Sequence, residues 1–100
     1  MKTLIEENGN QIVAQFIGRL DTAAAVATAE EIKPLLAAMQ KEIVLDCRQL
    51  EYISSSGLRI FLTIRKEAVA HGCKVVVSHL SADIRQVFMM TGFISLFEIR

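Results

Sequence analysis

The sequence predicts an α/β domain with a mixed, mostly parallel sheet of about five strands, an antiparallel N-terminal hairpin and about three helices. Apolar runs of β type alternate with segments of helical periodicity along the 100 residues, which favours parallel strands joined by right-handed crossovers. An Asn-Gly pair between the first two β runs is typical of a hairpin. Because no linker, repeat or low-complexity tract interrupts the chain, we expect one domain over residues 1–100.

The first two strands form the predicted hairpin. Thr3–Glu7 alternates weakly between apolar and polar residues, and Gln11–Ile17 is a stronger β run. Asn8-Gly9-Asn10 lies between them and supplies the turn. Gly18-Arg19-Leu20 then leads the chain out of the sheet.

The alanine-rich segment Ala23–Met39 predicts the first helix, and Asp21 or Thr22 can cap its free N–H groups. Pro34 lies within this segment, lacks a backbone donor and clashes with the carbonyl four residues earlier. We therefore expect a kink or a break near residues 31–33.

The middle of the chain predicts a buried strand followed by an amphipathic helix. The strand, Ile43–Cys47, is short and rich in aliphatic residues. The helix covers Gly57–His71, and Gly72 suits the left-handed conformation that ends many helices. The positions of this helix expected to face the core are Leu58, Ile60, Phe61, Leu62, Ile64, Ala68 and Val69.

The last third of the chain repeats this pattern. Lys74–Ser78 predicts a strand in the sheet interior, and Ala82–Thr91 predicts a helix with Ser81 as its cap and Gly92 as its stop. The inward positions of this helix are expected to be Ile84, Val87, Phe88 and either Met90 or Thr91. Leu96–Ile99 is expected to form the final strand.

Three consecutive serines, Ser54, Ser55 and Ser56, lie where the second helix begins, near Ser56 or Gly57. Hydroxyls at a helix start can accept from the N–H groups of the first turn, which explains at least one of the serines. A phosphate on Ser56 would lie at the positive end of the helix dipole, where an anion is stabilised. The turn can therefore accept a charge of roughly −1.5 to −2 without unfolding the domain.

These residues resemble the STAS domain of bacterial anti-sigma factor antagonists, proteins that free a sigma factor by sequestering its anti-sigma factor. In that family a strand leads into a loop reading roughly Asp-Ser-Ser/Thr-Gly-Leu, which residues 54–58 match except at the first position. Gly18-Arg19-Leu20-Asp21 is similar to the family's earlier Gly-x-Leu-Asp signature. The resemblance spans about residues 3–99 and implies a single-domain STAS-like fold.

The resemblance also implies a phosphorylation switch. The family's phosphoacceptor position carries over to Ser56, and Ser55 is both the second choice and the better candidate for a structural role. Unphosphorylated, the protein would bind an anti-sigma factor with serine kinase activity, and a serine phosphatase would restore that state. The partner-binding residues implied are Asp21, Ser54, Ser55, Ser56 and Gly57, with Arg59, Thr63 and Lys66 on the exposed face of the second helix.

In open parallel sheets the functional crevice lies beyond the carboxyl ends of the strands. We expect Asp21, Asp46 and the Ser54–Gly57 turn to meet at that edge. The two carboxylates would brace the turn by hydrogen bonds or place negative charge near the acceptor serine. The alternative is that both are ordinary cap and turn residues.

A second hypothesis is a constitutive scaffold. Some stand-alone STAS proteins resemble structural subunits of bacterial lipid-transport ATPases, and they dock through the same loop and helix without a phosphorylation cycle. Ser54, which replaces the acidic residue that usually opens the motif, keeps this alternative open. Phosphorylation of Ser56, together with the identity of the co-purifying protein, would separate the two hypotheses.

Other function classes lack the residues that they need. Eleven basic and eleven acidic residues cancel, so nucleic acid and anionic membranes are not expected partners. No apolar run approaches the ~20 residues of a membrane span and no signal peptide is apparent, which favours a cytoplasmic protein with no membrane insertion. No Gly-x-Ser-x-Gly motif is present, and His71 should lie about 22 Å from Ser56 along the helix, so we expect no enzyme.

Cofactor and metal sites are not expected either. No histidine or cysteine pair has the spacing of metal ligands, and glycines are too sparse for a phosphate-binding loop. Cys47 and Cys73 should lie at opposite ends of neighbouring parallel strands, on the order of 16 Å apart. Because a disulfide needs Cα atoms within about 7 Å, we expect two buried thiols.

Overall fold

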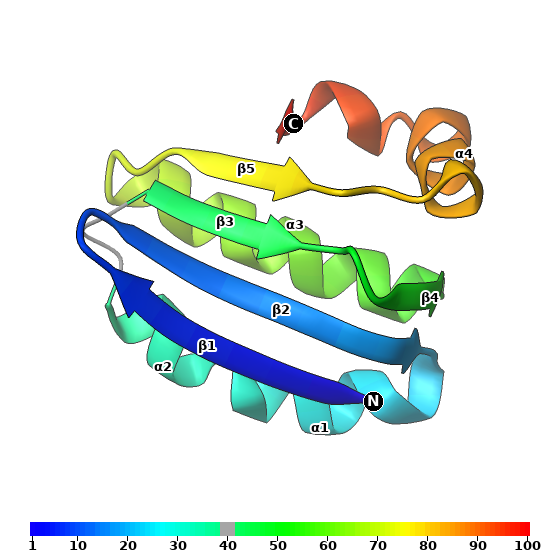
Figure 1. Ribbon diagram of the computed structural model, residues 1–100, viewed down its shortest axis with the longest axis horizontal. Coiled ribbons are helices and arrows are strands. Elements are labelled where there is room, and N and C mark those ends of the chain that lie inside the picture. The colour runs from blue at the N-terminus through cyan, green and yellow to red at the C-terminus, as the bar shows by residue number, and fades with distance from the viewer. Residues whose placement is uncertain (39–41) are drawn as a thin grey trace.

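The computed structural model describes residues 1–38 and 42–100 of the chain. Within these residues, six strands form one sheet, and α1, α2 and α3 lie behind it in the view of Figure 1. The elements in chain order are β1 (Lys2–Asn8), β2 (Gln11–Leu20), α1 (Thr22–Glu31), α2 (Lys33–Ala37), β3 (Glu42–Asp46), β4 (Leu50–Ile53), α3 (Ser55–Ala70), β5 (Val75–Ser78), α4 (Ala82–Thr91), a 3₁₀ turn η1 (Phe93–Ser95) and β6 (Glu98–Ile99).

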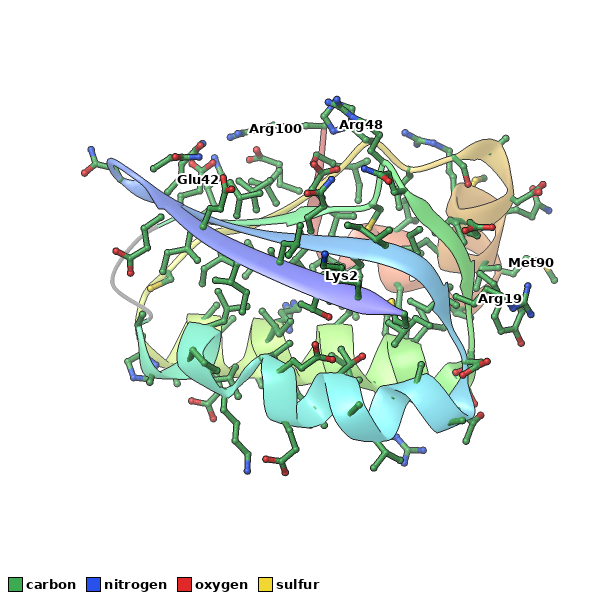
Figure 2. All side chains as sticks on the ribbon, turned by 60° about the horizontal axis from the view of Figure 1, so that its bottom comes forward. Lys2, Arg19, Glu42, Arg48, Met90 and Arg100 are labelled. Carbon is green, nitrogen blue, oxygen red and sulfur yellow. The ribbon has the colours of Figure 1, made fainter. Side chains whose placement is uncertain are left out.

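The strands are ordered β1-β2-β3-β5-β6, and β4 pairs with the far end of β2. β1 and β2 form an antiparallel hairpin, whereas the other pairings are parallel. From a second direction, Figure 2 shows the sheet above and α1 and α3 below it. The predicted fold class is confirmed, and β4 is an additional strand that the sequence did not predict.

The core lies between the sheet and the helices. Ile12, Ala14 and Phe16 alternate along β2 and are fully buried on its helix-covered face. The ring centroid of Phe61 on α3 lies 5.0 Å from that of Phe16 and 5.8 Å from that of Phe88 on α4. Aromatic contacts at such distances add to the free energy of burial. This cluster therefore joins α3 to both the sheet and α4.

β2 is longer than predicted. Gly18 has a φ of +103°, a conformation that suits glycine, and it lies where the pairing with β4 shifts register. A bulge of this kind bends a strand without ending it. The expectation that Gly18-Arg19-Leu20 leads the chain out of the sheet was therefore wrong, because these residues pair with β4.

The predicted break in the first helix is confirmed. Ile32 ends α1 and precedes α2, and Pro34 lies in the first turn of α2, where its missing N–H donor costs no hydrogen bond. Asp21, and not Thr22, is the cap of α1. Met39, the predicted end of the helix, lies outside the described residues.

Three side chains predicted to face the core lie outward. Val69 is 62% exposed and Met90 is 78% exposed. Since successive residues are about 100° apart around a helix, Met90 lies roughly 200° from the buried Phe88 and cannot share its face. Thr91 is also exposed, and its Oγ1 donates to the carbonyl of Val87 (2.8 Å) instead of packing inward.

The helix stops at Gly72 and Gly92 are confirmed, since both residues have positive φ angles. The last strand is shorter than predicted. Leu96 donates its N–H to the carbonyl of Phe93 (3.0 Å) and so continues the η1 turn, while Phe97 turns its ring into the core. Only Glu98–Ile99 of the predicted strand pairs with β5.

Candidate functional site

Ser54 shapes the turn between β4 and α3. Its N–H donates to the carbonyl of Leu20 (2.9 Å), its Oγ accepts from the N–H of Gly57 (3.2 Å), and its carbonyl accepts from the N–H of Leu58 (2.9 Å). Ser54 is therefore the N-cap of α3. The expectation that Ser55 is the structural serine was wrong, because α3 begins at Ser55 and its cap is the preceding residue.

Gly57 is buried where α3 crosses β2 and β4. A Cβ at this position would lie 2.7 Å from Cγ of Leu20 and 2.8 Å from Cγ1 of Ile53. Real side chains do not approach so closely, so any larger residue would push the start of α3 away from the sheet. The glycine thus allows a close approach that holds the preceding serine in place.

Ser55 and Ser56 occupy the first turn of α3 but do not cap it. Ser55 is exposed and Ser56 is half-buried. In the part of the chain that the structure describes, neither hydroxyl has a hydrogen-bond partner. A surface hydroxyl without a structural role is available for modification or for contact with another protein.

An apolar groove of about 330 Å³ runs between α1 and α3, which lie side by side under the sheet (Figure 2). Each helix contributes four residues at i, i+3, i+4 and i+7 spacing, which places them on one helix face. The lining residues are Thr22, Ala25, Val26 and Ala29 from α1, and Ser56, Arg59, Ile60 and Thr63 from α3. Mostly small side chains form the α1 wall, so the groove stays open. Of the lining residues on α3, Ser56 is nearest to the start of the helix.

The predicted outer face of α3 is confirmed as exposed. Arg59, Thr63 and Lys66 all lie at the surface, and the first two also line the groove. The Oγ1 of Thr63 donates to the carbonyl of Arg59 (3.0 Å). Within residues 1–38 and 42–100, the side chains of Arg59 and Lys66 form no ion pair. This face therefore presents positive charge to the solvent.

Asp21 lies beside the groove but is occupied structurally. Its Oδ1 accepts from the N–H of Ala24 (2.8 Å), so it caps α1 directly before Thr22, the first groove residue. The same capping interaction orients the start of α1. Asp21 thus positions one wall of the groove, while the described contacts give it no hydrogen bond to the serine turn.

Asp46 does not belong to this site. Along β2, Asp46 pairs with Gln15, whereas Ile53 pairs with Leu20, five residues further on. At the rise of a β-strand, the end of β3 therefore lies about 17 Å before the serine turn. The expectation that Asp46 joins Asp21 and Ser54–Gly57 at one edge was wrong, because β4 extends beyond the end of β3.

Asp46 instead forms what we call the Asp46 corner, with Arg48 and His79. Its Oδ1 accepts from the N–H of Arg48 (2.9 Å) and lies 3.6 Å from Nδ1 of His79. The Nη2 of Arg48 donates to Nε2 of His79 (2.9 Å), since a guanidinium has no acceptor. Figure 2 shows Arg48 well apart from Arg19, which lies at the serine-turn end of β2.

Two features near the serine turn were not predicted from the sequence. The first is the α1 wall of the groove, whose regular spacing was a usable signal. The second is a stack of Arg19 on Tyr52, with the guanidinium carbon 4.4 Å from the ring centroid. Tyr52 belongs to β4 and is 41% exposed, so this stack extends the surface beside the turn.

The histidines and cysteines lie away from Ser56. The Nδ1 of His71 donates to the carbonyl of Glu67 (2.8 Å) at the far end of α3, since a carbonyl oxygen only accepts, and His79 belongs to the Asp46 corner. Burial, and secondarily the Asp46 charge, raises the pKa of the Cys47 thiol to about 12, which makes it unreactive at neutral pH. Cys73 is only partly buried, so the expectation of two buried thiols was half wrong. The next strand, β5, begins at Val75, so Cys73 lies in the segment between α3 and β5.

The described residues contain no group of three or more metal-ligating side chains that could hold an ion. None of the helices in residues 1–38 and 42–100 has the length and apolar character to cross a membrane.

Comparison with known proteins identifies relatives over nearly the whole chain. The model of the STAS domain family matches residues 2–100. BtrV of Bordetella bronchiseptica, named provisionally as an anti-sigma factor antagonist, is 29% identical over 99 residues, which are 99% of this chain and 85% of that protein.

Two solved structures share the fold. TM1081 of Thermotoga maritima, also named provisionally as an anti-sigma factor antagonist, has a TM-score of 0.87 at 16% identity and covers 97% of this chain and 84% of that one. SpoIIAA of Bacillus in its phosphorylated form has a TM-score of 0.73 at 20% identity and covers 99% of this chain and 91% of that one.

Proposed function

The chain belongs to the STAS domain family, and we propose that it is an anti-sigma factor antagonist switched by phosphorylation of Ser56. One observation carries the proposal. Ser54 alone caps α3, which leaves Ser56 without a structural role in the lining of the groove between α1 and α3. The names of the relatives BtrV and TM1081 support the antagonist role, and the phosphorylated form of SpoIIAA supports the switch.

In the unphosphorylated state, the protein binds an anti-sigma factor that has serine kinase activity. The contact comprises the Ser54–Gly57 turn and the exposed face of α3 with Arg59, Thr63 and Lys66, while Asp21 orients the opposite wall of the groove. The exposed cations attract an acidic partner surface and the groove accepts apolar side chains. The protein itself is the substrate of the kinase and catalyses no reaction.

Phosphorylation of Ser56 places a charge of roughly −1.5 to −2 in the middle of this contact. Burying that group under a partner without compensating donors costs several kcal/mol, which is enough to release the partner. A serine phosphatase restores the binding state. The cycle operates in the cytoplasm and requires neither nucleic acid nor membrane insertion.

Ser54 is compatible with this cycle even though the family usually has an acidic residue there. Serine and aspartate are both strong N-caps, and the Oγ of Ser54 makes the capping hydrogen bond to Gly57. The substitution therefore retains the local geometry of the turn. A constitutive scaffold subunit, for example of a lipid-transport ATPase, is the alternative that the following experiment would detect.

Matched bait proteins test the proposal. Ser56→Ala and Ser56→Asp proteins, with Arg48→Ala at the Asp46 corner as the control, are used to capture partners from the native cells, and the captured proteins are identified by mass spectrometry. The control lowers the net charge by one, as Ser56→Asp does, but outside the proposed contact. We expect an anti-sigma factor with serine kinase activity on Ser56→Ala and on Arg48→Ala, and its loss on Ser56→Asp. Capture of a transport ATPase in equal amounts by all three baits would refute the phosphorylation switch and support the constitutive scaffold.

A further inference from the structure

Arg59 is placed to respond to the charge state of Ser56. The two residues are three apart on α3, and residues at this spacing are neighbours on a helix surface. Both line the same groove, so their side chains border one space. Among the residues that the structure describes, the guanidinium of Arg59 has no hydrogen-bond or ion-pair partner.

The helix start offers a phosphate only part of its usual donors. The N–H of Gly57 is occupied by Ser54 Oγ, and the N–H of Leu58 is occupied by the Ser54 carbonyl. The N–H groups of Ser55 and Ser56 are left, and they cannot satisfy three phosphate oxygens with two charges. A side-chain cation is therefore the group that would decide where the phosphate lies.

The other charged groups around the groove do not compete for this role. The α1 wall, Thr22, Ala25, Val26 and Ala29, carries no charge, and the carboxylate of Asp21 is turned to the N–H of Ala24. On α3, Lys66 lies ten residues beyond Ser56, about 15 Å along the helix axis. Arg19 does not line the groove, and its guanidinium is stacked on Tyr52.

We propose that Arg59 is the intramolecular receptor of the phosphate on Ser56, and that this ion pair lies across the groove between α1 and α3. The inference rests on the proposed function of Ser56 but adds the group that holds the phosphate. Phosphorylation then changes two features of the docking surface at once. It neutralises the exposed cation at the groove, and it covers the apolar space between Val26 and Ile60.

The pair is tested on protein that carries phosphoserine at position 56, introduced during synthesis by an expanded genetic code. The phosphorus NMR signal of the full chain is followed from pH 4 to 9 in the wild-type background, in Arg59→Gln and in Lys66→Gln. Because a nearby cation favours the dianion, we expect the second phosphate pKa in the wild-type and Lys66→Gln proteins to be lower than in Arg59→Gln by about half a pH unit. Equal titrations in all three proteins would overturn the proposal.

Methyl NMR gives a second, independent measurement. The methyl signals of Val26 and Ile60 should shift more on phosphorylation in the wild-type background than in Arg59→Gln, since the ion pair holds the phosphate over the groove that these residues line with Ser56. Shifts of equal size in both backgrounds would contradict the placement.

These readouts are separate from the proposed function. If the titrations coincide, the proposed ion pair between Arg59 and the phosphate is refuted, whereas the proposed switch at Ser56 is unaffected. If Ser56 is never phosphorylated in cells, the switch fails whatever the titration shows.

Discussion

Two groups of polar residues follow parallel strands of this sheet, and they differ in what their side chains contact. At the Asp46 corner, after β3 and β5, Asp46, Arg48 and His79 interact with one another. At the serine turn after β4, one serine makes the capping bonds, and the next two serines and Arg59 have no side-chain partner among the described residues. Polar side chains that satisfy each other stabilise the fold, whereas polar side chains left without a partner beside a groove are the candidates for binding.

The largest expected effect comes from Gly57, which fixes the geometry of the serine turn. Gly57→Ala places a Cβ within contact distance of both Leu20 and Ile53, so we expect a loss of about 1–3 kcal/mol in the free energy of unfolding. Urea denaturation measures this loss. The control is Ser55→Ala, an exposed first-turn position that should change stability by less than about 0.5 kcal/mol. Equal stability of the two variants would show that the turn is not held by packing.

The second expected effect is on partner binding. Ser56→Asp puts a negative charge into the proposed contact, and we expect the affinity for the captured kinase to fall by about tenfold or more, or ~1.4 kcal/mol. Ser56→Ala should bind as the unmodified protein does. Isothermal titration with purified kinase measures both variants. Ser56→Ala should keep its melting temperature, because the Ser56 hydroxyl has no hydrogen-bond partner among the described residues. The melting temperature of Ser56→Asp should not fall, because an acidic residue in the first turn of a helix is stabilising. Indistinguishable affinities would remove Ser56 from the contact.

The third expected effect concerns the cap. Ser54→Ala loses the hydrogen bond from Ser54 Oγ to the N–H of Gly57, and we expect a loss of about 1 kcal/mol in stability. Ser54→Asp should retain most of that stability, because aspartate caps equally well. Thermal unfolding of the three proteins measures the difference. If Ser54→Ala is as stable as the wild type, then Ser54 is not the structural serine of the turn.

The smallest expected effect is at the Asp46 corner. Arg48→Ala removes an exposed contact to His79, and exposed pairs of this kind contribute about 0–1 kcal/mol. We expect a small change in melting temperature and no change in affinity for the kinase. A clear loss of affinity would place the Asp46 corner in the binding surface, so that the two regions would no longer differ in function.

Much of the fold follows from local sequence signals. The Asn-Gly turn, the caps Asp21 and Ser81, and the stops Gly72 and Gly92 each depend on the chemistry of one or two residues, and each lies where the sequence predicted it. Pro34 likewise marked the break between α1 and α2. Such features can be predicted from the sequence because a few neighbouring residues determine each of them.

Features decided by tertiary contacts were not predictable in this way. In β4, only the first and last of four residues are buried, so neither strand nor helix periodicity shows. Without β4, the end of β3 appeared to lie beside the serine turn, and Asp46 was assigned to the wrong group. The α1 wall of the groove was not predicted, because alanine is expected in a helix for its high helix propensity alone and does not by itself indicate a binding surface. Ser56 was found because serine before glycine at a helix start is a local pattern, whereas the groove beside it exists only once α1 and α3 pack.

Phosphopeptide mass spectrometry of this protein from its native cells, across growth and stress conditions, tests directly whether Ser56 is a switch. The peptide containing residues 54–56 should carry phosphate on Ser56, and the phosphorylated fraction should rise and fall with condition. Phosphate confined to Ser55, or a Ser56 that is unmodified in every condition, would contradict the switch.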